Sequence, residues 1–416
     1  KVMDDGSSQI ATFEYNARGH KTKEIDPLGR ETVYVYGTSN VPDTNPTTGE
    51  GMDLLQVKRK NGGSYDVLQS YTYNDKHQPL FFFNDTATTA IYTYNTAGQV
   101  LTVTTPPAQG HSQGATTTFS YDTDGYLTQV SGPVPSATTT FTYDAYGRKR
   151  TSTDASGLTL TYDYDARDRV TKVTNPDTTY EETQYKWLDA EKRRDRLGRW
   201  TQSFYDALRR PVATRDAAGQ TTQYQYGGAG CSSCAGGGDR LTKLIDPNGH
   251  ATTWEHDIQG RVIQETRANG SSESYTYEAT SSRLAQKTDR KDVTTTFEYF
   301  LDGKLKRKSY SDTTPAASYT YDPVDGQMLT AANGTDTLTW TYDALDRVAT
   351  EASTKNASTV GYTYDDARRV TTITSDLGET ITYGYNNASD VTSVDVRTST
   401  GTIVASRTLA YDEIGR

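Results

Sequence analysis

Hydrophobic and polar residues alternate along short stretches of this chain, each about six residues long and ending in tyrosine. The stretch Thr161-Tyr162-Asp163-Tyr164 is typical, because aromatic residues occupy every second position and polar residues lie between them. A period of two is the pattern of a β-strand whose two faces differ in burial. No window of the sequence shows convincing helical periodicity, so we expect an all-β protein.

Two kinds of turn separate the expected strands. After a tyrosine strand the chain reads Asp-x-x-Gly-Arg or a close variant, as in residues 144–148; after the next strand it reads Asp-Pro-x-Gly or a variant, as in residues 26–29. Aspartate caps its own backbone, proline presets φ and glycine allows the chain to leave the turn. Each repeat therefore contains two strands and two reversals, and we expect consecutive strands to be antiparallel.

The unit recurs about every 21 residues, which gives about 17 repeats over residues 1–416. Longer spacings indicate insertions near residues 37–70, 105–115, 227–240 and 386–408. We predict one repeat array rather than separate domains, and we expect a fragment of a larger protein because both ends fall inside a repeat. The last aromatic residue of each tyrosine strand is expected to be a structural anchor: Tyr94, Tyr121, Tyr143, Tyr164, Tyr205, Tyr226, Tyr277, Tyr321, Tyr342, Tyr364 and Tyr385.

The recurring Tyr-Asp-x-x-Gly-Arg motif resembles that of the RHS/YD-repeat family, and the resemblance covers essentially the whole chain. That family includes bacterial RHS toxins, encapsulating subunits of insecticidal toxin complexes, cell-wall-associated proteins and animal teneurins. The resemblance implies a continuous array of antiparallel β-hairpins, curled into a hollow shell or a superhelical β-solenoid. In toxin members the shell holds a C-terminal effector domain.

The expected length of the sheet favours a curled wall independently of this resemblance. About 17 repeats of two strands, spaced about 4.8 Å apart, give a sheet on the order of 160 Å long. A sheet of that length has to curl or coil, and side chains cannot fill a barrel of so many strands. The chain has 31 Tyr but only 9 Phe, which suits a wall with water on both faces.

Charge and hydropathy exclude two classes of partner. The formal net charge is −10, which opposes a surface for nucleic acid or anionic lipid, because such a surface needs a basic patch. No stretch of 18 apolar residues is present, so we expect no membrane span in this segment.

The sharpest local candidate for chemistry is the pair Cys231 and Cys234, in a glycine-rich insertion. With His250 and His256 they match the spacing of a zinc site, but a strand between the two histidines would hold them about 20 Å apart. A local disulfide, a weak zinc site and free thiols remain open for the two cysteines. We identify no catalytic residues and no cofactor-binding residues, and we expect no enzyme.

The sequence is consistent with two functions. The first is a structural, non-catalytic segment of a shell that encloses a cargo or toxin domain of an exported bacterial protein, secreted or at the cell surface. Its partners would be the remainder of the same polypeptide, namely further repeats and a C-terminal effector. The alternative is an extracellular adhesin or fibre scaffold that binds glycans, partner proteins or copies of itself through the insertion loops.

Overall fold

The structure is a computed structural model that describes residues 10–43, 51–84, 88–105, 114–134, 136–227, 240–278, 282–323, 326–343 and 345–412. Within these residues there are 36 β-strands and no helix. The strands are β1 (Thr12–Tyr15), β2 (Lys21–Ile25), β3 (Glu31–Thr38), β4 (Val41–Pro42), β5 (Asp53–Asn61), β6 (Ser64–Tyr73), β7 (Pro79–Asn84), β8 (Thr88–Tyr94), β9 (Val100–Thr105), β10 (Ala115–Tyr121), β11 (Leu127–Ser131), β12 (Thr138–Tyr143), β13 (Lys149–Thr153), β14 (Thr159–Tyr164), β15 (Val170–Thr174), β16 (Tyr180–Lys186), β17 (Asp189–Arg194), β18 (Trp200–Tyr205), β19 (Pro211–Arg215), β20 (Thr221–Tyr226), β21 (Leu241–Ile245), β22 (Ala251–His256), β23 (Val262–Thr266), β24 (Ser272–Tyr277), β25 (Leu284–Thr288), β26 (Thr294–Tyr299), β27 (Leu305–Tyr310), β28 (Ala317–Tyr321), β29 (Met328–Ala332), β30 (Thr337–Tyr342), β31 (Val348–Ser353), β32 (Ser358–Tyr364), β33 (Val370–Ser375), β34 (Thr380–Tyr385), β35 (Val391–Arg397) and β36 (Ile403–Thr408).

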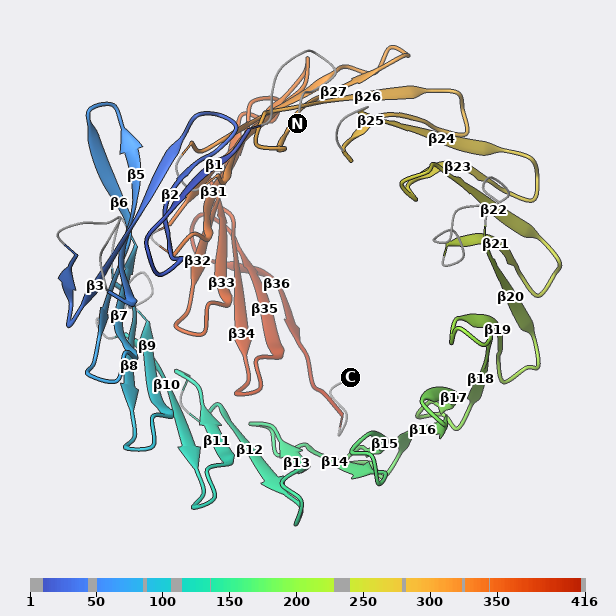
Figure 1. Cartoon of the computed structure of the whole chain (residues 1–416), viewed down its shortest axis with the longest axis horizontal. Helices are drawn as coiled ribbons and strands as arrows, with labels where there is room; N and C mark the ends of the chain where they lie inside the picture. The colour runs from blue at the N-terminus through green and yellow to red at the C-terminus, as the bar shows by residue number, and fades with distance from the viewer. Residues whose placement is uncertain are drawn as a thin grey trace.

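All the strands belong to one antiparallel sheet, which confirms the predicted fold class. Each strand pairs with the next one along the chain, except that β3 pairs with both the short β4 and β5. The sheet curls round an open middle, and its last strands, β31–β36, come round again inside the outline of the first turn (Figure 1). The array is therefore a spiral rather than a flat sheet.

Contacts between residues far apart in the sequence show how many residues make up one turn of the spiral. The Arg30 guanidinium lies 3.0 Å from the Asp302 carboxylate, 272 residues further along the chain. Arg59 donates a hydrogen bond of 3.2 Å to the Pro323 carbonyl oxygen, which is 264 residues away. One turn thus takes about 270 residues, and the chain completes more than one turn.

A β-bulge in every repeat explains why the sheet curls. In the pair β14–β15, Asp163 faces Lys172 but Tyr164 faces Val170, so Thr171 is an extra residue on the second strand. A bulge bends its strand and increases the local twist. The same register shift recurs directly before the anchor tyrosine of other repeats, always at the C-terminal end of the tyrosine strand. The anchors concerned are Tyr121, Tyr143, Tyr205, Tyr226, Tyr277, Tyr321, Tyr342, Tyr364 and Tyr385.

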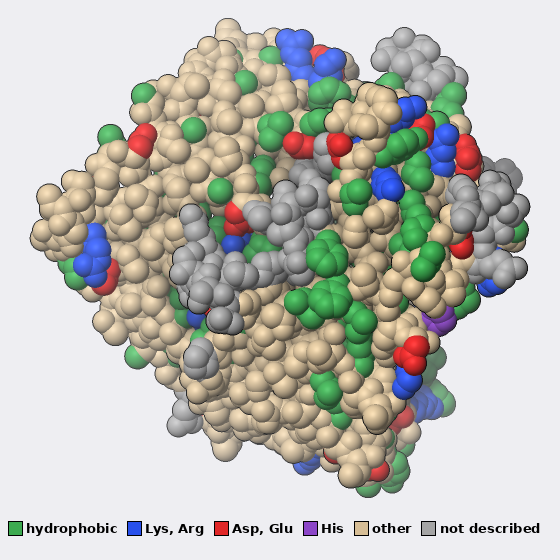
Figure 2. Space-filling model, turned by 90° about the vertical axis from the view of Figure 1, so that its left-hand side faces the viewer, with side chains coloured by type: hydrophobic (Ala, Val, Ile, Leu, Met, Phe, Trp, Pro, Cys, Tyr) green, Lys and Arg blue, Asp and Glu red, His purple; other side chains and the backbone are tan. Residues whose placement is uncertain are grey.

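The two faces of the sheet differ in chemistry. Tyr162 pairs with Val173 on one face, because directly opposed residues of an antiparallel pair point the same way. The other face carries pairs of threonine hydroxyls within hydrogen-bonding distance of each other: Thr93–Thr102, Thr104–Thr116, Thr142–Thr151, Thr320–Thr330 and Thr341–Thr350. On the side of the molecule shown in Figure 2 most of the surface is backbone and uncharged polar side chain, with few charged groups.

The sheet is one layer thick and has almost no core. Among the described residues the buried hydrophobic side chains are only Leu55, Val57, Ala90 and Ala115, and no large side chain is fully buried. Most strand residues on both faces are half-buried. Contacts between neighbouring repeats, rather than a packed interior, therefore have to hold the wall together.

Two of the four expected insertions consist largely of strands in the part that the structure describes. Residues 53–73 contain the strands β5 and β6, and residues 391–408 contain β35 and β36, all paired with their neighbours in the ladder. Backbone pairing does not need the tyrosine motif, so β5, β35 and β36, whose sequences lack it, were not expected as strands. The expected insertions at 105–115 and 227–240 lie almost entirely outside the described residues.

The glycines of the turns provide the first test. Gly147 and Gly157 have φ of 78° and 82°, a conformation that costs other residues about 1–2 kcal/mol. A Cβ on Gly157 would meet open space, but one on Gly147 would overlap the Tyr126 hydroxyl, whose ring stacks on Tyr143. We expect both Gly→Ala variants to lower the urea midpoint of unfolding, and Gly147→Ala to lower it more. Equal shifts would show that the Tyr126 contact contributes nothing.

Candidate functional site

The turn after each tyrosine strand is held by its aspartate. In residues 165–169, Asp165 Oδ1 accepts the backbone N–H of Arg167 at 2.8 Å and that of Arg169 at 3.1 Å. Its other oxygen, Oδ2, accepts a hydrogen bond of 2.8 Å from Arg169 Nε. The same pair of side chains occurs as Asp144–Arg148, Asp206–Arg210, Asp257–Arg261, Asp343–Arg347 and Asp365–Arg369.

The arginine of this turn also binds the following repeat. The Arg369 guanidinium lies over the Tyr385 ring, 4.4 Å from the ring centroid, and Nη1 donates a hydrogen bond of 3.2 Å to the Asn386 carbonyl oxygen. Cation–π contact and a charged donor make this link stronger than one between neutral groups. The same stacking occurs for Arg148 on Tyr164, Arg169 on Tyr185, Arg210 on Tyr226, Arg261 on Tyr277, Arg283 on Tyr299 and Arg347 on Tyr364.

The tyrosine returns a hydrogen bond to the previous repeat. The Tyr385 hydroxyl donates to the carbonyl oxygen of Val370 at 2.7 Å, and Val370 directly follows Arg369. We call the aspartate, the arginine and the tyrosine of the next repeat the clasp. The other ten anchors named from the sequence donate in the same way: Tyr94 to Pro79, Tyr121 to Val100, Tyr143 to Leu127, Tyr164 to Lys149, Tyr205 to Ala190, Tyr226 to Pro211, Tyr277 to Val262, Tyr321 to Leu305, Tyr342 to Met328 and Tyr364 to Val348.

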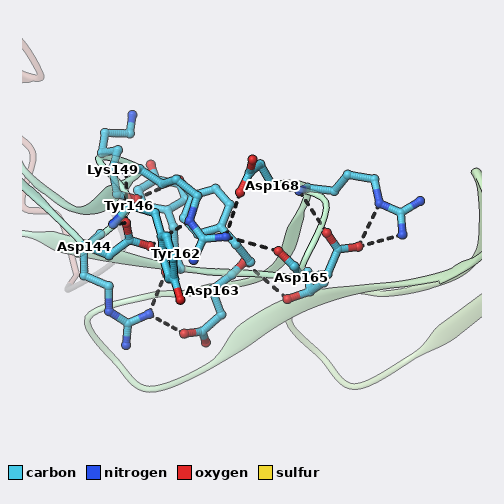
Figure 3. A network of polar contacts seen from close by, with 12 residues as sticks. Asp144, Tyr146, Lys149, Tyr162, Asp163, Asp165 and Asp168 are labelled. Atoms are coloured by element: carbon cyan, nitrogen blue, oxygen red, sulfur yellow. Dashed lines mark hydrogen bonds and ion pairs between the residues drawn. The ribbon is translucent and has the colours of Figure 1, made fainter.

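Figure 3 shows the clasp where two repeats meet, around Asp144, Asp165 and Asp168. Arg148 Nη1 reaches beyond its own turn to the Asp168 carboxylate at 2.9 Å and to the Asp165 carbonyl oxygen at 3.1 Å. Asp168 replaces the usual glycine of the turn and keeps a positive φ of 60°. Neighbouring turns are thus linked by charged contacts as well as by the strand ladder.

An uncharged form of the clasp occurs nearer the N-terminus. Gln78 takes the place of the arginine: its side chain accepts a hydrogen bond of 2.9 Å from Asn74 and donates one of 2.8 Å to the Gly98 carbonyl oxygen of the next turn. Asn95 and Gln99 repeat this arrangement one unit later. The geometry of the link is therefore kept when its charge is removed.

The clasp shifts the acidity of its members. The hydrogen bond from Arg169 and those from the turn backbone lower the pKa of Asp165 to about 2. Backbone and side-chain hydrogen bonds from Arg210 lower the pKa of Asp206 as well. Burial raises the pKa of the anchors Tyr277 and Tyr385, so their hydroxyl donors stay protonated to a higher pH than that of an exposed tyrosine.

Within the described residues, the structure does not bring the candidate zinc ligands together. Cys231 and Cys234 lie outside the described residues. His250 ends a turn, with Nδ1 3.1 Å from the Asp246 carboxylate, whereas His256 lies at the far end of β22 in the place of an anchor tyrosine. Within the ranges that the structure describes, no group of three or more His, Cys, Asp or Glu is placed to hold a metal ion.

The described part of the chain offers little else for chemistry. None of its elements is a helix that is long and apolar enough to cross a membrane. The repeated arrangement of charged side chains and aromatic rings is the clasp, and it joins one repeat to the next. What the clasp does chemically is to hold adjacent hairpins at fixed spacing.

Comparison with known proteins gives the same repeat and the same fold. The RHS repeat family model matches residues 143–180 and 238–272. The crystal structure of TcdB2-TccC3 without its hypervariable C-terminal region superposes with a TM-score of 0.63 at 15% identity, over 99% of this chain and 25% of that one. The TcdB2-TccC3-Cdc42 structure gives 0.50 at 13% identity, over 97% and 27%. No curated protein matches the chain, which spans about a quarter of these solved structures.

A matched pair of arginines tests the clasp. Arg261 stacks on Tyr277, whereas Arg199 bonds Asp195 in the same way within its own turn but has a side chain that is 64% exposed. We expect Arg261→Met to destabilise the chain by on the order of 1–2 kcal/mol, because both the stacking and the charged hydrogen bonds are lost. Arg199→Met should leave the urea midpoint of unfolding almost unchanged. Equal effects would contradict the role given to stacking.

Acid provides a second test of the clasp. Asp165 has a folded pKa of about 2 against an ordinary value of 3.8, so its contribution to stability is present above about pH 4 and is lost as pH falls towards 2. We expect the unfolding midpoint to fall over that range. Asp165→Asn should make the fall shallower, and Asp124→Asn, at an exposed turn position, should not. The same pH dependence in all three proteins would exclude Asp165 as a contributor.

Proposed function

We propose that the chain, which matches the RHS repeat model over residues 143–180 and 238–272, is a segment of a shell wall that encloses a cargo or toxin domain of an exported bacterial protein. The observation that carries this proposal is the one-layer sheet, which winds through more than one turn round an open middle and whose successive turns touch. A wall of this kind separates an inside from an outside without needing a core of its own.

The construction of the wall supports enclosure over catalysis. Most side chains on both faces of the sheet are half-buried. The polar contacts that recur in the described residues join one repeat to the next. A rigid lining without a convergent polar site suits a container. The proposed role is therefore non-catalytic, and no cofactor is required for it.

The solved relatives suggest where a cargo would lie. The TcdB2-TccC3 structure with a TM-score of 0.63 is of a protein without its hypervariable C-terminal region. By analogy, the partners of this chain would be further repeats and an effector in the same polypeptide. Export to the cell surface or the medium belongs to the same proposal, because an enclosed toxin acts outside its producer.

The alternative, an adhesin or fibre scaffold that binds glycans or partners through loops, has less to rest on. Two of its four candidate loops consist largely of the paired strands β5, β6, β35 and β36. Paired strands offer fewer free backbone groups and less adaptable surfaces than loops do.

Limited proteolysis combined with electron cryo-microscopy of the natural full-length protein tests enclosure. We expect a closed shell with density inside it, and a C-terminal region that resists protease until the shell is opened with mild denaturant. An open filament with an empty bore, or a C-terminal region cleaved as fast in the native protein as after denaturation, would contradict the proposal.

A further inference from the structure

One clasp in the middle of the array lacks two of its three members. The Gly227 N–H donates a hydrogen bond of 3.0 Å to the Arg240 carbonyl oxygen, as the turn aspartate does to its arginine in a complete clasp. Gly227 thus holds the aspartate position without a carboxylate, and Arg240 holds the arginine position. His256 takes the place of the anchor tyrosine at the end of β22. We call this link between the hairpins β20–β21 and β22–β23 the His256 joint.

Arg240 still reaches across to the next repeat. Its Nη1 donates a hydrogen bond of 3.2 Å to the Asp257 carbonyl oxygen, and Asp257 directly follows His256. Arginines of other clasps make this same contact with the residue after the anchor, while their guanidinium groups lie over the anchor ring. The Arg240 charge is therefore held beside an imidazole, where those clasps have a phenol.

The other groups around the half-buried His256 ring compensate little for that charge. The Asp257 carboxylate is already paired with Arg261, whose Nε donates to it at 2.6 Å. On the opposing strand His256 faces the uncharged Val262, and Glu265 of that strand accepts a hydrogen bond from a tryptophan indole.

The charged residues of the strands β21 and β22 do not face the ring either. Lys243 of β21 is opposite Thr253, which shares a face of the sheet with Glu255. Successive residues of a strand point to opposite faces, so both Lys243 and Glu255 point away from the face of His256. Arg240 is thus the charge that acts most strongly on the imidazole.

This arrangement favours the neutral form of the imidazole. Burial and the Arg240 charge lower the pKa of His256, and the Asp257 carboxylate offsets them only in part. An open joint would expose the ring to water and separate it from the arginine. Below the ordinary value of 6.5 the open form takes up a proton more readily than the closed form, so the joint loses stability as pH falls.

We infer that the His256 joint is an acid-sensitive gate, at which the wall opens more often as pH falls below neutrality. Protonation of His256 places two positive charges side by side where no turn aspartate is present to hold Arg240. Complete clasps keep their charges over the same range, since the pKa of Asp165 is about 2. The joint is formed by neighbouring repeats within the chain, and the inference goes beyond the proposed function because it holds with or without a cargo.

Native-state hydrogen exchange of the intact chain at two pH values tests the gate. The amides of β21 and β22 are compared with those of β14 and β15 at about pH 7.5 and about pH 5.5, a range in which histidine side chains titrate. Each rate is divided into the intrinsic rate at the same pH, so that only protection factors are compared. We expect protection in β21 and β22 to fall several-fold in acid, and protection in β14 and β15 to stay unchanged.

Three variants separate His256 from other causes of pH dependence. His256→Tyr restores an anchor tyrosine and should remove the acid-induced loss of protection. Arg240→Met removes the neighbouring charge, so it should reduce that loss while lowering protection at neutral pH as well. His250→Asn is the control, because the His250 side chain is 67% exposed in the turn between the same two strands, and this variant should keep the loss.

Equal protection factors at the two pH values in the wild-type chain would overturn the inference. A loss that His256→Tyr retains, or that His250→Asn abolishes, would also overturn it. If His256→Tyr does not fold, as judged by circular dichroism, Arg240→Met decides instead, and an acid-induced loss as large as that of the wild type would count against the gate. A loss that a metal chelator abolishes would assign the pH dependence to a bound ion and would overturn the inference too.

Discussion

The clasp between an Asp-Arg turn and the tyrosine of the next repeat is the interaction on which the rest of this structure depends. Strand pairing alone gives a ladder, but a ladder one layer thick has no opposing layer to hold its twist. Arg369, stacked on Tyr385 and bonded to the following turn, fixes the spacing and angle of adjacent hairpins. Repetition of that link with a bulge in every unit turns a long ribbon into a spiral with a constant sense of curvature.

Polar and aromatic contacts between repeats stabilise a wall built in this way, in place of a core of buried hydrophobic side chains. The tyrosine ring covers apolar surface, and its hydroxyl satisfies a backbone carbonyl, so the same residue serves both needs at a surface that water reaches. The uncharged clasp of Gln78 and Gln99 shows that the carbonyl contact is retained even where the charge is not. Stability should then be close to a sum of repeat and neighbour terms, without a central core to unfold.

The local sequence predicted the strands and turns well because each has a short-range cause, such as the period of two around Tyr162 or the Asp-x-x-Gly turn at Asp144. The clasp was missed, although a signal was present: the hydroxyl of Tyr164 and its acceptor Lys149 are 15 residues apart, and other repeats keep nearly the same separation. The strand at residues 53–61 was missed because its sequence lacks the tyrosine motif. Contacts such as Arg30–Asp302 depend on accumulated curvature over 272 residues, which no local pattern encodes.

Native-state hydrogen exchange of the intact chain tests most directly whether the clasp stabilises the wall. We expect slower exchange for the backbone amides of β14, which the Arg148 clasp joins to its neighbour, than for those of β8, which the uncharged Gln78 clasp joins. Protection should follow the kind of clasp along the array. Equal protection in the two strands, or protection that depends only on distance from the chain ends, would show that the clasp does not stabilise the wall.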